Sequence, residues 1–275
     1  MLAALIIVFR EVIEAGLIIG VVLAATKGVP HRGRWVVYGI LGGLIGASLV
    51  AAFAAGIEEA FSGVGQEMLN VVVLLLAVAM LAWHNAWMSR HGREMAMEMK
   101  AFGKEVSAGK RSLAALAIVV GVAVLREGSE VVLFLSGIVA QAKESYGSIF
   151  LGGLLGIGCG GLVSALMYGG LIVIPTRYLF STTSGLITLL AAGMAAQAVS
   201  WLEQAGIVQT LADPLWNTSW LLSEDSMLGR VLHTLVGYTA QPSGAELIAY
   251  GVTVALMVVL IRIAKRQPQP RAVPA

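Results

Sequence analysis

Two short motifs place basic and acidic side chains inside segments that are otherwise apolar. They are Arg10-Glu11-Val12-Ile13-Glu14 and Arg126-Glu127-Gly128-Ser129-Glu130, so the pattern Arg-Glu-x-x-Glu occurs twice, 116 residues apart. On an α-helix the positions i, i+1 and i+4 share one side, which lets both carboxylates of a motif face one point. Carboxylate oxygens are the ligands that hard cations prefer. The motifs therefore predict a site for a metal ion.

The charges of the motifs are costly where they stand. A charged side chain in the middle of a bilayer costs ~2.5–3.5 kcal/mol on insertion scales, and such residues mark ion pathways or pair with one another. Four glutamates and two arginines leave a formal charge of −2, which costs less to bury than four bare carboxylates. The alternative is that each motif is only a salt bridge that holds helices together. We expect the acids to be metal ligands and the arginines to support them, namely Glu11, Glu14, Glu127 and Glu130 with Arg10 and Arg126.

The composition indicates an all-α integral membrane protein. Of 275 residues, 58% are hydrophobic and only 12% are charged, where a soluble domain carries ~25% charged residues. The apolar runs lack the period-two alternation of barrel strands, and a helix satisfies its own backbone hydrogen bonds in lipid. About 20 apolar residues cross the hydrocarbon core. Seven transmembrane helices are predicted, at about 2–26, 35–57, 68–88, 112–141, 147–174, 178–202 and 245–264.

The positions of lysine and arginine predict the orientation. Cytoplasmic connections carry an excess of these residues. Of the 18 in the chain, all but four follow the first, third or fifth predicted helix or lie at the C-terminal end. This distribution predicts an N-out, C-in topology in a multi-pass protein of the cell membrane. It also accounts for the net charge of +2 without any nucleic-acid partner, since basic loops face the anionic lipids of the inner leaflet.

An internal repeat organises the chain. When the two motifs are superposed, Gly42-Gly43-Leu44-Ile45-Gly46 also aligns with Gly152-Gly153-Leu154-Leu155-Gly156 after a small change of offset, and the third and sixth helices match more weakly. Each unit has three crossings, so the second copy enters from the other side, and transporters bind their substrates between such inverted halves. We expect one permease domain over 1–275, divided into repeat one (1–88), a cytoplasmic loop (89–111), repeat two (112–203), an outer loop (204–244) and a seventh helix with its tail (245–275).

Several polar residues outside the motifs have two interpretations. Glu58, Glu59 and Glu67 flank the outward connection between the second and third helices, where they form either a cation entrance or an ordinary exposed acidic loop. His84 stands between tryptophans near the inner end of the third helix. This context favours an aromatic anchor at the membrane boundary over a metal ligand at the exit.

The paired motifs, the seven-helix plan and the segment from Trp220 to Arg230 resemble the oxidase-dependent iron permease family over essentially the whole chain. The resemblance implies high-affinity iron uptake across the plasma membrane or a bacterial inner membrane, with the motif glutamates as iron ligands. It also implies a separate ferroxidase or periplasmic partner that oxidises iron. Iron is then the transported substrate, membrane lipid surrounds the protein, and no tightly bound cofactor is expected.

Two other functions stay open at this point. Carboxylates also suit Mn²⁺ and other divalent ions, so a permease for manganese or lead is the first alternative. The second is a membrane-embedded redox enzyme with a carboxylate-held iron centre. That enzyme would use Glu-x-x-His pairs on facing helices, and neither motif has a histidine at this spacing.

Overall fold

The computed structural model describes residues 1–60, 66–141, 146–170, 176–224 and 226–266. Within these ranges the regular structure is helical, and the only β pairing is an isolated bridge between Pro214 and Ser243. The described part contains eight helices, which in chain order are α1 (Leu2–Ala25), α2 (Arg32–Ala60), α3 (Gln66–Ser107), α4 (Leu113–Gln141), α5 (Tyr146–Tyr168), α6 (Thr176–Gln204), α7 (Met227–Val236) and α8 (Gly244–Arg266).

The helices define a multi-pass membrane protein. Five segments of α2, α3, α5, α6 and α8 are long and apolar enough to cross a bilayer, at Arg32–Ile57, Glu67–Ser89, Tyr146–Tyr168, Thr182–Gln204 and Gly244–Ala264. The helices α1 and α4 have sufficient length, with 24 and 29 residues, but each includes the three charges of a motif. These two helices carry the candidate site.

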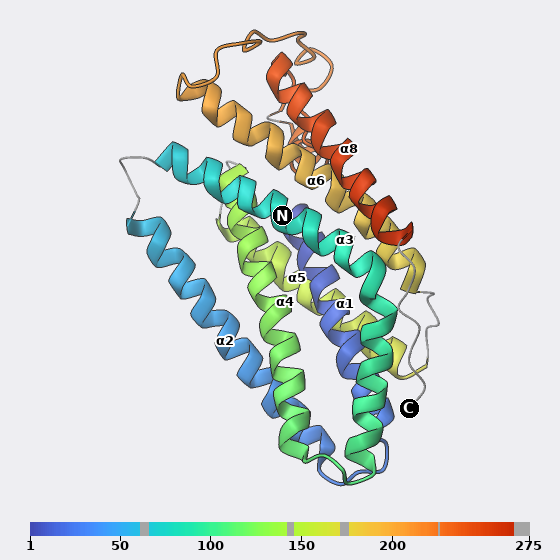
Figure 1. Ribbon diagram of the computed structural model, residues 1–275. Helices are drawn as coiled ribbons and strands as arrows, with labels where there is room; N and C mark the ends of the chain where they lie inside the picture. Colours follow the sequence, from blue (N-terminus) through green and yellow to red (C-terminus); the bar gives the residue numbers. More distant parts are fainter. Residues whose placement is uncertain (61–65, 142–145, 171–175, 225, 267–275) are drawn as a thin grey trace.

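Two connections differ from the sequence-based expectation. The stretch 89–111 was predicted as a loop, whereas α3 continues as a helix to Ser107. In Figure 1 this long helix changes direction part-way along its length. The stretch 204–244, predicted as a loop, contains the short helix α7. Ser226 caps its start, where the hydroxyl accepts a hydrogen bond from the amide of Gly229, and Gly237 caps its end in the left-handed conformation. Local capping signals therefore define α7 well.

Two apolar clusters separate the polar middle of the bundle from its ends. The first joins the start of α1 to α3, the end of α4, α6 and α8, and includes Ile7, Leu74, Leu81, Phe134 and Ile138. The second joins the end of α1 to the starts of α2 and α4 and the end of α3, and includes Val22, Val36, Phe102, Leu116 and Val120. The motif residues lie between these clusters along α1 and α4.

Close helix pairs surround the centre. The helix α2 lies along α4, α5 lies along α1, and α8 lies along α6 (Figure 1). Glycines permit the first two approaches. A Cβ atom on Gly43 would lie 2.7 Å from the carbonyl oxygen of Gly121, and one on Gly156 would lie 2.8 Å from that of Leu5. Small residues let backbones approach in this way where lipid supplies no hydrophobic driving force.

We predict that Gly156→Ala destabilises the fold, because its new methyl group meets backbone atoms of α1 that cannot move aside locally. The expected loss is about 1–3 kcal/mol, the usual cost of overpacking, seen as a lower unfolding temperature in detergent. Gly158→Ala is the matched control, since a Cβ there has no neighbour within 4 Å among the described residues. Equal unfolding temperatures for the two variants would contradict the close approach of α5 to α1.

Candidate metal centre

The structure brings both motifs together in the interior. The helices α1 and α4 contact each other, and α3 packs against both. The side chains converge on one buried region, and the exposed fraction is 7% or less for Glu11, Glu14, Glu127 and Glu130. The four acids predicted from the sequence are therefore neighbours.

Arg10 binds both acids of its own motif. Its Nη1 atom lies 3.0 Å from Oε1 of Glu11, and its Nη2 atom lies 2.9 Å from Oε1 of Glu14. The guanidinium is 3% exposed. A planar fork with several donors can serve two carboxylates at once, which a single ammonium group cannot do in the same geometry. This pairing offsets part of the negative charge that the site buries.

Arg126 has a different environment. Its Nε atom lies 3.2 Å from Oε1 of Glu130, and its guanidinium stands 4.5 Å from the centre of the Trp87 ring. The Arg126 side chain is 39% exposed, so it is far more open than Arg10. The cation–π contact with an indole ring stabilises the guanidinium where only one carboxylate pairs with it.

His84 lies inside the site, and its predicted role as a boundary anchor is wrong. It is 2% exposed, and its Nε2 atom lies 3.2 Å from Oε2 of Glu14. On the other side of the ring, Nδ1 lies against Oε2 of Glu130. The imidazole thus bridges the two motifs. Helical spacing could have indicated this, because His84 continues the buried stripe of α3 formed by Leu74, Ala77 and Leu81.

Four side chains point potential ligand atoms at a common centre. One atom from each of Glu11, His84, Glu127 and Glu130 lies within 4.8 Å of every other. Within the described part of the chain, Oε2 of Glu11 and Oε2 of Glu127 have no hydrogen-bond partner. Buried carboxylate oxygens without partners are costly, and a bound cation would satisfy them together. Glu14 stands at the edge of this group, between Arg10 and His84.

Other polar residues that the sequence indicated do not join the cluster. Glu59 and Glu67 are exposed, and Glu67 lies roughly 25 Å along α3 from His84. The side chain of Glu58 is outside the described residues. Ser129 donates to the carbonyl oxygen of Leu125, which is a hydrogen bond within its own helix.

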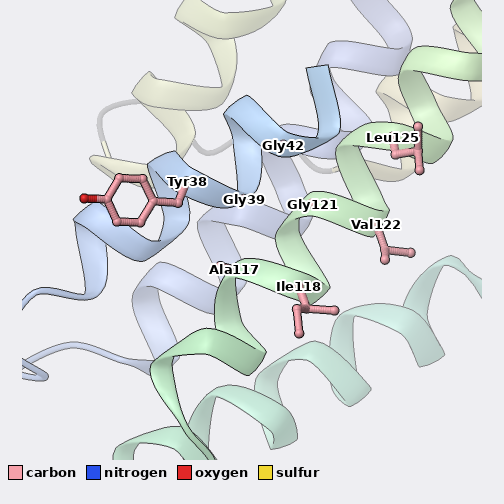
Figure 2. Close-up of a pocket in the computed structure, with 8 residues that line it drawn as sticks. All are labelled: Tyr38, Gly39, Gly42, Ala117, Ile118, Gly121, Val122 and Leu125. Carbon is pink, nitrogen blue, oxygen red and sulfur yellow. The ribbon is translucent and has the colours of Figure 1, made fainter. Parts of the chain in front are cut away.

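A cavity of about 320 Å³ lies between α2 and α4, apart from the ionisable cluster. Figure 2 shows its wall, to which Tyr38, Gly39 and Gly42 contribute from one helix and Ile118, Val122 and Leu125 from the other. The lining carries no carboxylate or imidazole, so it is unsuited to hold a metal ion.

The helices and the buried ionisable cluster define a polytopic membrane protein of the class that carries ions. The chain belongs to the iron permease FTR1 family, whose match covers residues 1–266. It is 30% identical over 250 residues, 90% of each chain, to the ferrous iron permease EfeU of Escherichia coli O6:K15:H31 (strain 536 / UPEC). It is 28% identical over 280 residues to the protein of the same name from Yersinia pestis, covering 100% of this chain and 98% of that one.

No solved structure matches the chain. The family and the relatives are permeases. This excludes the membrane-embedded redox enzyme that the sequence left open as an alternative.

We predict that Arg10→Lys destabilises the protein more than Arg126→Lys. The first change removes one of two contacts made by a buried guanidinium, and a hydrogen bond to a charged group contributes about 1.5–3 kcal/mol. The second change affects a half-open side chain with one carboxylate partner, where an ion pair contributes less. Unfolding temperatures in detergent measure both. An equal or larger loss for Arg126→Lys would contradict the different environments of the two arginines.

Proposed function

We propose that this chain imports ferrous iron across a bacterial inner membrane through the buried site between α1, α3 and α4. The observation that carries the proposal is the convergence of ligand atoms from Glu11, His84, Glu127 and Glu130 within 4.8 Å. The site charge also favours a divalent ion, because four carboxylates and two guanidiniums sum to −2 when His84 is neutral. A ferrous ion brings this total to zero, which lowers the cost of burial.

We infer that seven helices cross the membrane and that repeats one and two form an inverted pair, with the N-terminus outside. Matched contacts support this arrangement. Gly43 approaches the carbonyl oxygen of Gly121 and Cβ of Val124 in the same way that Gly156 approaches those of Leu5 and Val8. These contacts make Gly43 equivalent to Gly156, whereas the alignment of the glycine motifs matched Gly43 with Gly153. The two registers differ by three residues. In this arrangement α3 of repeat one is equivalent to α6 of repeat two. These two helices contact each other, as expected for elements that meet near the axis relating the repeats.

The membrane potential supplies a driving force for the proposed transport. At 100 mV, inside negative, each elementary charge gains ~2.3 kcal/mol on crossing the full field, so a dication gains about 4.6 kcal/mol. Rocking of two inverted halves around a fixed site would expose the ion first to one side and then to the other. The two apolar clusters would separate the site from each side in turn.

The proposal keeps a separate oxidase as a partner, as the family resemblance implies. In that case iron is oxidised by another protein before or during passage, and this chain supplies the path. Manganese is the alternative substrate that the carboxylates favour, since oxygen ligands suit Mn²⁺ well.

We predict that Glu127→Gln and Glu130→Gln each abolish iron uptake while the protein remains inserted. Glutamine keeps the size of the side chain but removes a charged ligand from the buried group. Uptake of radioactive iron by metal-starved cells measures the effect, with membrane content checked by immunoblot. Glu98→Gln, an exposed change on the same protein, is expected to retain uptake. Normal accumulation by the two site variants would contradict the proposed iron path.

Flux into proteoliposomes tests the substrate. We expect the purified protein to carry radioactive iron supplied in the ferrous form, with Mn²⁺ as a weaker competitor and Mg²⁺ as a poor one, because the site includes an imidazole beside its carboxylates. Ferrous and ferric iron are supplied separately, with and without an added ferroxidase. If the flux of Mn²⁺ exceeds the flux of both ferrous and ferric iron, manganese and not iron is the substrate.

A further inference from the structure

His84 lies between ligand atoms of both motifs. It is 2% exposed, its Nε2 atom lies 3.2 Å from Oε2 of Glu14, and its Nδ1 atom forms an ion pair with Oε2 of Glu130. In the same group, Oε2 of Glu11 and Oε2 of Glu127 have no hydrogen-bond partner within the described residues. Buried carboxylate oxygens without partners, beside an imidazole, favour a bound cation.

The separations fit one ion. Metal bonds to nitrogen and carboxylate oxygen are about 2.0–2.2 Å long, so ligand atoms on opposite sides of an ion stand ~4.2 Å apart. The ligand atoms of Glu11, His84, Glu127 and Glu130 all lie within 4.8 Å of one another. A cation bound here would draw the more distant ligand atoms inward and would separate Nδ1 of His84 from Oε2 of Glu130, which contact each other without it.

Glu14 has a different position from the other three acids. Its Oε2 atom lies 3.2 Å from Nε2 of His84, and its Oε1 atom lies 2.9 Å from Nη2 of Arg10. A carboxylate that accepts from one ring nitrogen leaves the other nitrogen free to bind metal, and this carboxylate–histidine–metal arrangement fixes the ring and its tautomer. Arg10 in turn holds Glu14 in place.

The nitrogen ligand also breaks the symmetry of the two motifs. When Met80 is matched with Met194, as in the alignment of the third and sixth helices, His84 corresponds to Ala198, a buried side chain with no ligand atom. Only the α3 side therefore supplies a nitrogen. Imidazole suits iron and zinc, whereas all-oxygen sets suit Mg²⁺, Ca²⁺ and Mn²⁺.

We propose that His84 is a metal ligand through Nδ1, that it makes the site selective for transition-metal dications over Mg²⁺ and Ca²⁺, and that Glu14 is a positioning residue for its ring. This proposal rests on the proposed function, because it assigns roles within the same ion site. The sequence predicted four motif glutamates as the metal ligands. In the proposed ligand set, His84 takes the place of Glu14.

The test uses the purified full chain in detergent with Mn²⁺ as a paramagnetic probe. Electron spin-echo modulation from ¹⁴N is expected for bound Mn²⁺, and this modulation is expected to vanish in His84→Gln and to persist in His91→Gln, a histidine two turns further along α3. Modulation that persists in His84→Gln, or bound Mn²⁺ without any ¹⁴N modulation, would overturn the role of His84 while leaving an oxygen-ligand permease intact. If neither Mn²⁺ nor Fe²⁺ binds the unaltered protein, the ion site itself fails.

Two further variants separate the ligand from its positioning residue. Glu14→Gln is expected to weaken Fe²⁺ binding by roughly 10- to 100-fold, the usual effect of losing an outer partner, and to retain ¹⁴N modulation. His84→Glu converts the set to oxygen alone and is expected to lower the preference for Fe²⁺ over Mg²⁺ by about tenfold or more, because imidazole suits iron and an all-oxygen set suits Mg²⁺. An unchanged preference in His84→Glu would overturn the selectivity role.

Discussion

The fold depends on the burial of ionisable groups between two apolar clusters. Arg10 pairs with Glu11 and Glu14, Arg126 pairs with Glu130, and His84 lies between the motifs. Partial pairing makes such a group tolerable in a dry interior, but it leaves several carboxylate oxygens without partners among the described residues. The helices therefore enclose a group of charges that is only partly compensated by its own pairs.

Close packing of the outer helices makes this geometry possible. Along α2 and α5, glycines bring the backbone against α4 and α1, the two helices that carry the motifs. Apolar side chains could not hold these helices by a hydrophobic driving force in lipid, so close backbone contact takes its place. Each motif helix is thus supported on one side by a glycine-lined partner and faces the other motif on its opposite side. This support fixes the positions from which the carboxylates converge.

The sequence predicted the convergence of the acids because residue type, helical spacing and repetition all pointed the same way. It did not predict that His84 is buried between the motifs, because the neighbouring tryptophans resemble a boundary belt; in the structure Trp83 is 72% exposed, whereas His84 is 2% exposed. The backbone contacts of the glycines favour a register different from the one that the glycine motifs suggested, because similar motifs offer several alignments. Similarly, the end of the apolar run in α3 gave no sign that the helix continues to Ser107.

The two arginines show how similar motifs acquire different environments. Arg10 is 3% exposed and holds two carboxylates, whereas Arg126 is 39% exposed and holds one beside Trp87. The motifs share their charged residue types, so the difference comes from α3, which contacts both α1 and α4 and supplies His84 and Trp87. The third helix therefore gives two motifs of the same residue types unequal surroundings, with one arginine enclosed among carboxylates and the other open beside an indole ring.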